Sequence, residues 1–357
     1  MLNKKDIFYI KRCFQLAQLG IGNVSPNPAV GAVIIYQDCI IGEGFHKYYG
    51  GAHAEVEAVN SVSEKNKSLL SRSTIYVSLE PCFHYGKTPP CVDLILREKI
   101  QRVVIAITDS NPKVGGKSIE KLKAAGIAVD IMQKNDWTAE LLILKRITLN
   151  PFFTRIEKHR PYIILKWAQT LDGFIGQHEK RAIISNETTK RLVHKWRSEN
   201  DAIMVGHQTA LTDNPMLDNR FYFGKPPVRI TFDKEKKLPD DLNIFNAKQE
   251  TIIFTAVKNA LPPYFYLESY GTLLGLENLL AILHEKNIGS LLIEGGTALL
   301  KSFIDAGLWD EARIMTAKKN LFEGIKAPEL KNAELIKTEN VADDFIQYWI
   351  NEKNDYV

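Results

Sequence analysis

Three residues that lie far apart in the sequence, His53, Cys82 and Cys91, have the kinds of side chain that bind zinc in proteins. One histidine and two cysteines fill three positions of a tetrahedral ion and leave the fourth open, which is typical of catalytic zinc. A chain that uses this set must bring three distant segments to one point. The set therefore constrains the fold as well as the chemistry.

Glu55 follows His53 by only two residues, and this spacing restricts where both can lie. In the middle of a helix their side chains would point to nearly opposite faces, because each residue turns by about 100°. Both can reach one site only from the first helical turn. Cys91 follows Pro89-Pro90 at the predicted start of another helix, and a helix N-terminus lowers the pKa of a thiol. We therefore expect two helix N-termini to present ligands to one zinc ion.

A structural zinc ion, or a buried histidine near unrelated cysteines, is the alternative interpretation. A structural site needs a fourth protein ligand, and the nearby candidate is His84, two residues after Cys82. We favour a catalytic site, because the His-x-Glu and Pro-Cys motifs both coincide with predicted ends of strands and helices.

The chemistry of this set is that of zinc-dependent nucleobase deaminases, in which the glutamate transfers protons and does not bind the metal. Zinc would lower the pKa of a bound water toward about 7. Glu55 would then pass a proton to a ring nitrogen and to the departing ammonia. Eight residues separate Cys82 from Cys91, whereas nucleic-acid and nucleoside deaminases have Pro-Cys-x-x-Cys. The wide spacing indicates a different substrate.

The chain has 357 residues, and domains average roughly 150, which favours two domains. A formal net charge of +4 suits an anionic small substrate but is too small for a nucleic-acid-binding surface. Four cysteines without regular pairs favour a reducing compartment, and we expect Cys13 and Cys39 to be buried as small apolar residues. Because we find no signal-peptide pattern and no apolar run of roughly 18 residues, we expect a cytoplasmic protein without a membrane segment.

The first half of the chain alternates strand and helix patterns in the order β-β-α-β-α-β-α-β. This order predicts an α/β sandwich whose later strands are mostly parallel, with a hairpin at Gln37-Asp38. Asn150-Pro151 and His159-Arg160-Pro161 bracket a polar segment, so we expect two domains, 1–150 and 151–357. The second domain is also predicted to be α/β, with strands at 162–167, 202–205, 228–232, 251–255, 291–293 and 345–350.

Three motifs of the first half resemble the deaminase half of the bifunctional riboflavin-biosynthesis deaminase/reductase family. They are Pro26-Asn27-Pro28-Ala29-Val30-Gly31, His53-Ala54-Glu55 and the segment 81–91, whose Gly-x-Thr-Pro-Pro-Cys ending is particular to that family among zinc deaminases. The resemblance implies a cytidine-deaminase-like fold and a diaminopyrimidinone ribosylamine 5′-phosphate as substrate. Turn formation explains Asn27 and Asn111 equally well. The implied substrate contacts are Asn27, His46, His84, Lys87, Asp109 and Asn111.

The second half resembles the reductase domain of the same family, which has a dihydrofolate-reductase-like fold. The matching segments are 165–168, 171–173, 209–215 and Glu294-Gly295-Gly296-Thr297. Two glycines between an apolar strand and a helix let backbone amides approach a phosphate, although Gly-Gly alone is more often a tight turn. The resemblance implies that NADPH reduces the ribosyl group of the deaminated product to a ribityl chain.

The resemblance also assigns roles to single residues of the second half. Lys166 and Glu294 would act as catalytic residues on the opened sugar. Arg197 and Arg220 have the planar donors that bind phosphate, although a single arginine is more often an ordinary surface residue. The implied substrate contacts are Arg197, Leu217, Arg220 and Glu294, and the implied cofactor contacts are Ala168, Thr209, Asp213, Gly296 and Thr297.

The sequence departs from the family pattern between Gly173 and Asn186, where the insert is short and polar. Ile183-Ile184-Ser185-Asn186 stands where many relatives have a tryptophan in contact with the cofactor. The cofactor contacts within 174–186, and the choice between NADPH and NADH, therefore stay open.

Three other functions are compatible with parts of this pattern. A nucleoside or tRNA deaminase fused to an unrelated domain would have Pro-Cys-x-x-Cys or a basic stripe, and neither is present. A zinc-stabilised binding protein leaves the second half unexplained. An active deaminase with a decayed reductase is disfavoured by Lys166, Asp213 and Glu294. We therefore expect a bifunctional enzyme that binds a small phosphorylated pyrimidine, zinc and NADPH, but neither nucleic acid nor membrane. A homo-oligomer is one expectation for its assembly.

Overall fold

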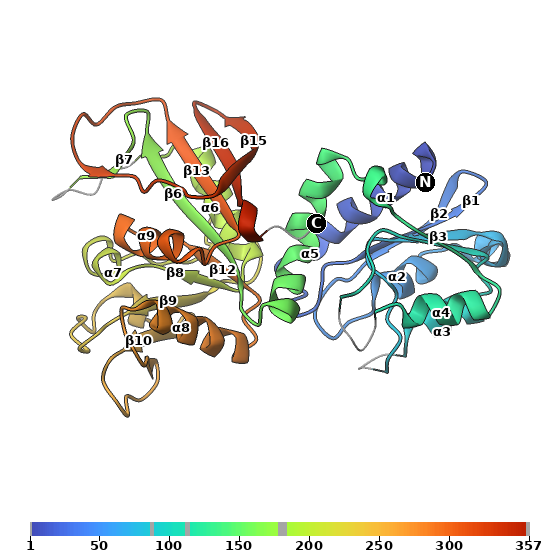
Figure 1. Cartoon of the computed structure of the whole chain (residues 1–357), viewed down its shortest axis with the longest axis horizontal. Coiled ribbons are helices and arrows are strands. Elements are labelled where there is room, and N and C mark those ends of the chain that lie inside the picture. The colour runs from blue at the N-terminus through green and yellow to red at the C-terminus, as the bar shows by residue number, and fades with distance from the viewer. Residues whose placement is uncertain (1, 86–88, 111–114, 178–183, 355–357) are drawn as a thin grey trace. The chain divides into compact units, whose positions relative to one another are not determined.

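The computed structural model describes residues 2–85, 89–110, 115–177 and 184–354. The chain divides into two units, Met1–Lys158 and His159–Val357. Each unit has its own sheet and its own buried core (Figure 1). None of the helices in the described ranges is both long and apolar enough to cross a bilayer.

The sheet of the first unit has five strands in the order β2-β1-β3-β4-β5. Strand β1 is antiparallel to β2 and β3, whereas β3, β4 and β5 are parallel, as the predicted element order requires. The expected hairpin joins β1 to β2, and Gln37 and Asp38 have φ angles of 47° and 63° at its turn. The strands are β1 (Gly31–Tyr36), β2 (Cys39–Phe45), β3 (Thr74–Val77), β4 (Arg102–Ile105) and β5 (Ala128–Ile131).

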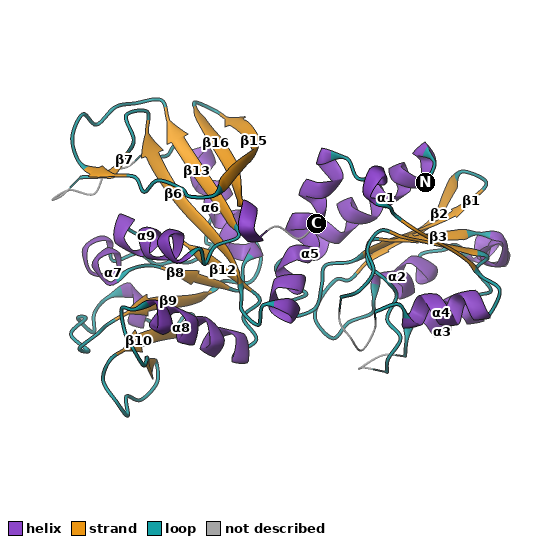
Figure 2. Cartoon of the chain, in the orientation of Figure 1, coloured by secondary structure: helices purple, strands orange, loops and turns teal. Residues whose placement is uncertain are grey.

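Helices cover both faces of this sheet, so the unit is an α/β/α sandwich (Figure 2). Helices α2, α3 and α4 pack on one face, and α1 and α5 contact each other on the opposite face. The Asn3 side chain caps α1 by accepting the N–H groups of Lys5 and Asp6 at 2.8 and 2.9 Å, which contributes about 1 kcal/mol. The helices are α1 (Lys4–Ala17), α2 (Ala54–Asn60), α3 (Cys91–Arg97), α4 (Lys117–Ala124) and α5 (Ala139–Glu157), with 3₁₀ helices at Gln18–Gly20, Glu64–Arg72 and Lys134–Asp136.

The division between the units differs from the boundary that we expected after residue 150. Helix α5 continues through Asn150 and Pro151, and the units divide between Lys158 and His159. A proline inside a helix removes one backbone hydrogen bond, but the buried side chains of Leu149 and Phe153 hold α5 on both sides of it. The segment that we predicted to be a polar linker is therefore largely helical.

The sheet of the second unit has nine strands in the order β11-β10-β9-β8-β12-β6-β13-β16-β15. Neighbours from β11 to β13 are parallel, and the last two pairs are antiparallel. The expected strands are present as β6, β8, β9, β10, β12 and β16. We missed β13 because Glu311 and Arg313 interrupt its apolar pattern, yet both are buried and their side chains pair at 2.6 Å. The bounds are β6 (Tyr162–Thr170), β8 (Ala202–Met204), β9 (Val228–Phe232), β10 (Thr251–Thr255), β11 (Tyr264–Tyr266), β12 (Ser290–Ile293), β13 (Glu311–Ala317), β15 (Ala333–Val341) and β16 (Asp344–Asn351).

Helices α8 and α9 pack on one face of this sheet, and α6 and α7 pack on the other. Strands β8, β12 and β6 are parallel neighbours, so their carboxyl ends meet at one edge of the sheet. Ligands of open α/β sheets bind at such an edge. The helices are α6 (Glu187–Glu199), α7 (His207–Asp213), α8 (Leu273–Glu285) and α9 (Thr297–Ala306), with 3₁₀ helices at Asn243–Phe245 and Glu352–Asn354 and a separate strand pair, β7 (Phe174–Gly176) and β14 (Ile325–Lys326).

Candidate active sites

The structure brings His53, Cys82 and Cys91 together in the first unit. The Nδ1 atom of His53 lies 3.4 Å from the Sγ atom of Cys82 and 3.3 Å from that of Cys91. His53 is the N-cap residue of α2, and Cys91 is the first residue of α3. Two helix N-termini therefore present ligand atoms, and Cys82 joins them from the segment between β3 and α3.

These three donor atoms fit a zinc ion. Tetrahedral zinc with nitrogen at about 2.1 Å and sulfur at about 2.3 Å places its ligand atoms about 3.6 Å apart, close to the observed distances. Hydrogen bonds from Cys91 and His53 lower the pKa of the Cys82 thiol, which favours the thiolate that zinc requires. His84, the alternative fourth ligand, is exposed and lies outside the metal-ligand group found among the described residues. The set therefore fits an open catalytic site better than a closed structural one.

Glu55 is the second residue of α2, and only 3% of its surface is exposed. Burial raises the pKa of its carboxyl group, and the neighbouring Cys82 raises it further. Glu55 lines the same cavity as His53 and Cys82. A carboxyl group with a raised pKa in this place can take up a proton and release it.

The cavity beside the metal ligands has a volume of about 370 Å³. Four of the expected substrate contacts, Asn27, His46, His84 and Asp109, line it. His46 is buried with Nδ1 2.9 Å from the Ala52 carbonyl oxygen, so with the proton on Nδ1 its Nε2 accepts the Asn27 amide at 3.2 Å. The other two expected contacts, Lys87 and Asn111, lie outside the described residues.

Glu80 also lines this cavity, and the sequence did not identify it. Its buried carboxylate accepts the N–H groups of Asp109 and Gly116, both at 3.1 Å, and the hydroxyl of Ser118 at 2.5 Å. Glu80 thereby holds the backbone of Asp109 at the end of the neighbouring strand. Its place directly before Pro81-Cys82 was the only available sequence signal.

Helix α5 supplies another part of the cavity wall that we did not predict. Phe152, Arg155 and Ile156 line the cavity. They do so together with the expected substrate contacts Asn27, His84 and Asp109. We missed them because the sequence pattern placed residues after 150 in a linker.

We expect about one zinc ion per purified chain, and we expect Cys91→Ala to reduce the zinc content severalfold, because one of three protein ligands is lost. Zinc would be measured by atomic absorption after dialysis. Cys39→Ala is the matched control, since Cys39 is exposed on β2 rather than buried as we expected. Equal zinc in the Cys91 variant and the wild type would place the ion elsewhere.

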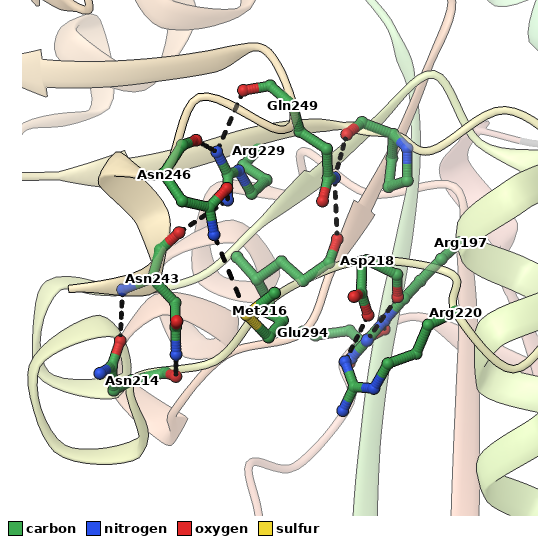
Figure 3. Close-up of polar contacts among 12 residues, drawn as sticks. Arg197, Asn214, Met216, Asp218, Arg220, Arg229, Asn243, Asn246, Gln249 and Glu294 are labelled. Carbon is green, nitrogen blue, oxygen red and sulfur yellow. Dashed lines mark hydrogen bonds and ion pairs between the residues drawn. The ribbon is translucent and has the colours of Figure 1, made fainter.

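In the second unit, Lys166, Arg197 and Glu294 form one group of charges whose side chains are mostly buried. Arg197 of α6 donates from Nε and Nη2 to the two carboxylate oxygens of Glu294 at 3.0 and 2.8 Å (Figure 3). The Lys166 Nζ atom of β6 lies 3.8 Å from Oε2 of Glu294. Burial acts to raise the pKa of Glu294, but Arg197 and Lys166 together lower it to about 2. This carboxyl group is therefore ionised at neutral pH.

The two arginines that we expected to bind phosphate differ in their surroundings. Arg197 directs its planar edge at Glu294, and its Nη1 atom donates to the Asp218 carbonyl oxygen at 3.0 Å. Arg220 is half exposed and pairs with the Asp218 carboxylate. Arg220 is therefore better placed to accept an anion, whereas Arg197 orients Glu294.

Leu217 lies beside them, but its side chain is buried in an apolar cluster with Ile203 and Val205. A substrate contact by Leu217 would therefore involve its backbone.

His194 is a buried residue of this region that sequence reasoning missed. It lies one helical turn before Arg197, and its ring packs edge-on against Phe221 at 4.8 Å. Burial, followed by the charges of Arg197 and Arg220, lowers the pKa of His194 to about 4. The ring is therefore neutral at pH 7 and adds no charge to the group.

Glycines at the starts of α7 and α9 leave backbone atoms accessible near the carboxyl ends of β8 and β12. The N-cap residues are Gly206 and Gly296, which have no side chain to cap the helix. A Cβ atom at Gly295 would lie 3.5 Å from the Gly206 nitrogen, and one at Gly296 would lie 3.6 Å from the Thr209 hydroxyl oxygen. A Cβ atom at either glycine would touch neighbouring atoms, and without one the backbone at the starts of both helices is less covered, which is the arrangement that a phosphate-binding turn uses.

The remaining expected cofactor contacts lie on α7, β6 and α9. Thr209 and the exposed Asp213 are on α7, and Ala168 is partly buried on β6. Thr297 begins α9, and its hydroxyl donates to the Lys326 carbonyl oxygen at 2.9 Å. Residues 178–183, part of the segment 174–186 that departs from the family pattern, lie outside the described residues. Cofactor contacts there therefore stay a prediction.

Family models match both units of the chain. The model described as the cytidine and deoxycytidylate deaminase zinc-binding region matches residues 3–107, and the model described as the RibD C-terminal domain matches residues 161–341. The riboflavin biosynthesis protein RibD of Aquifex aeolicus is 36% identical over 98% of this chain and 99% of its own length. RibD of Actinobacillus pleuropneumoniae is 37% identical over 88% of this chain and 84% of its own.

Solved structures agree with these matches. A diaminohydroxyphosphoribosylaminopyrimidine deaminase/5-amino-6-(5-phosphoribosylamino)uracil reductase from Thermotoga maritima has a TM-score of 0.86 and 33% identity, covering 97% of this chain and 99% of its own. Acinetobacter baumannii RibD has a TM-score of 0.82 and 29% identity over the same shares. The similarity therefore extends through both units rather than one.

Proposed function

The chain belongs to the RibD family of riboflavin-biosynthesis proteins, and from this membership we propose that its two units catalyse consecutive steps on one phosphorylated pyrimidine. The first unit, with a cytidine-deaminase-like fold, is a zinc-dependent deaminase. The second, with a dihydrofolate-reductase-like fold, is a reductase. The first substrate is 2,5-diamino-6-(5-phosphoribosylamino)pyrimidin-4(3H)-one, and the final product is 5-amino-6-(5-phosphoribitylamino)uracil.

In the deaminase unit, His53, Cys82 and Cys91 would hold the zinc ion. When bound, zinc supplies a water molecule whose pKa is lowered enough to make it a nucleophile at neutral pH. The Glu55 carboxylate would accept a proton from the attacking water and pass it to the ring nitrogen, and would then take a second proton from the hydroxyl added to the ring and pass it to the departing amino group. Burial supports this role, because it raises the pKa of the Glu55 carboxyl group above its ordinary value and so makes proton uptake easier.

Other residues of the first unit would bind and orient the pyrimidine. The hydrogen bond from Asn27 to His46 fixes both side chains at the cavity wall. Glu80 holds the backbone of Asp109 where it can face the substrate. His84 and Lys87 would contact the phosphorylated sugar side of the molecule.

In the reductase unit, NADPH would supply a hydride to C1 of the ring-opened ribosyl imine, and a proton would go to the nitrogen. Lys166 is the group that can deliver this proton, since burial lowers its pKa although Glu294 opposes the shift. Glu294, held by Arg197, keeps the lysine in place. Arg220 would bind the substrate phosphate. Ala168, Thr209, Asp213, Gly296 and Thr297 would contact the nucleotide.

The observation that supports two activities best is the coexistence of both groups of residues in one chain that aligns end to end with the Aquifex relative. A decayed reductase is disfavoured because Lys166, Arg197 and Glu294 form an interacting, mostly buried group. The four cysteines have no disulfide partners, so we propose a reducing, cytoplasmic location.

The test supplies purified, zinc-loaded protein with the diaminopyrimidinone ribosylamine phosphate and NADPH. We expect ammonia release and NADPH oxidation in about equal amounts, because the two steps are consecutive. Ammonia without NADPH oxidation would leave a deaminase with an inactive second unit. If folded protein gives neither signal, the substrate assignment is rejected and the metal site is again interpreted as structural.

A further inference from the structure

Arg229 of β9 is fully buried, and its hydrogen-bond partners among the described residues are all neutral oxygen atoms. Its Nε atom donates to the Thr251 hydroxyl at 3.1 Å. Its Nη1 and Nη2 atoms each donate twice to oxygens within 243–249, at 2.7 to 3.0 Å. All five donors of the guanidinium are thus used. A buried charge is costly unless it is satisfied in this way, so Arg229 holds the loop 243–250 in one conformation.

This loop in turn holds the segment 214–217, as Figure 3 shows. The backbone N–H of Asn243 donates to Oδ1 of Asn214 at 2.6 Å, and its side-chain amide donates to the Asn214 carbonyl oxygen at 2.7 Å. The Gln249 amide donates to the Leu217 carbonyl oxygen at 3.3 Å. Further contacts are Gln249 Nε2 to the Pro227 carbonyl oxygen at 3.0 Å and Asn246 Nδ2 to Met216 Sδ at 3.9 Å.

The segment 214–217 needs support from outside because of its backbone conformation. Asn214 and Leu217 have φ angles of 40° and 52°. Leucine is unfavourable in this left-handed region, and such a conformation persists only where neighbouring groups hold it. The buried Leu217 side chain holds it from one side, and the Gln249 amide holds its carbonyl group from the other.

Asp218 connects this segment to the charged group of the reductase unit. Its carbonyl oxygen accepts Arg197 Nη1 at 3.0 Å, and its carboxylate accepts Arg220. Arg197 also holds Glu294 (Figure 3). A change in the Leu217 backbone would therefore move the partner of both arginines.

We propose that Gln249 and Arg229 are positioning residues for substrate binding in the reductase unit. They act through Leu217 and Asp218, which place Arg220 for the substrate phosphate. The proposal rests on the reductase activity proposed above. Gln249 holds Leu217, next to Asp218, whereas the proposed nucleotide contacts lie on α7, α9 and β6, so the effect of Gln249 falls on the pyrimidine substrate and not on NADPH.

The test uses Gln249→Met in the full chain, which keeps the length of the side chain and removes its donor. We expect KM for 5-amino-6-(5-phosphoribosylamino)uracil to rise roughly tenfold, while KM for NADPH and the rate of ammonia release stay within about twofold. Arg229→Lys keeps the charge but has three donors instead of five, and we expect a rise in the same KM. Gln347→Met on β16 is the matched control.

A KM for the pyrimidine within twofold of wild type in folded Gln249→Met overturns the proposal. A lower melting temperature with unchanged KM, or an equal rise of both KM values, also overturns it, because either result means a merely structural role. Wild-type protein that does not reduce the supplied pyrimidine rejects the proposed function itself. If the wild type is active and the Gln249→Met variant has an unchanged KM for the pyrimidine, only the positioning role is rejected.

Discussion

Glu55→Gln will reduce ammonia release by roughly 10²- to 10⁴-fold, the range over which a general acid/base group acts. The amide has nearly the same shape as the carboxyl group but cannot carry a proton between water and substrate. NADPH oxidation will continue at the wild-type rate when the deaminated pyrimidine is supplied directly. Ammonia release is measured with the diaminopyrimidinone substrate, and NADPH absorbance is followed in a separate reaction with the deaminated pyrimidine.

Glu57→Gln is the matched control, because Glu57 is two residues further along α2 and forms a surface ion pair with Lys47 at 2.5 Å. Zinc content is measured in both variants so that loss of metal is not mistaken for loss of the proton carrier. Deamination above a tenth of the wild-type rate in zinc-loaded Glu55→Gln would assign the proton transfer to another group.

Glu294→Gln will destabilise the second unit by about 3–5 kcal/mol and abolish measurable reductase activity, because Arg197 and Lys166 lose the mostly buried carboxylate that they face. The first unit will keep its deaminase activity. Urea unfolding is followed by tryptophan fluorescence, which mainly reports the second unit, since Trp137 is the single tryptophan of the first.

The stability difference between wild type and Glu294→Gln also depends on pH. The pKa of Glu294 is about 2 in the folded chain against an ordinary 4.5. Its charge therefore contributes full stability above about pH 4.5, and this contribution falls as pH drops toward 2, by about 3 kcal/mol in all. The difference in unfolding free energy between wild type and Glu294→Gln should therefore become smaller over that pH range. Glu199→Gln, which removes a surface pair with Lys195, should show little difference at any pH. A difference in unfolding free energy that does not change with pH would mean that packing, and not charge, causes the loss of stability.

Sequence patterns picked out the three candidate metal ligands that the structure brings together, because metal chemistry restricts the residue type and the spacing. His53 and Glu55 can share a site only at a helix N-terminus, and that is where the structure has them. The strands were predicted where apolar runs are short and bounded by turn residues. Helix α5 was missed because Asn150-Pro151 resembles a chain break, and β13 was missed because buried polar residues interrupt it.

The polar groups that support the sites have no such sequence pattern. Glu80 gains its partners from residues near 109–118, and Arg229 gains its partners from 243–251. In both cases one buried side chain bonds mainly to backbone groups of a loop, which most loop sequences can provide. Only the folded chain shows which carboxylate or guanidinium is used in this way.

The course of α5 has a consequence for how the two units could be exchanged during evolution. Phe152, Arg155 and Ile156 belong to the wall of the deaminase cavity, yet they follow the proline at which the sequence suggests a break. A recombination point at residue 150 would separate these three residues from the deaminase unit and join them to the domain that follows. A recombination point after Lys158 keeps the deaminase unit whole. The unit can therefore be inherited as a module only if all of helix α5 is inherited with it.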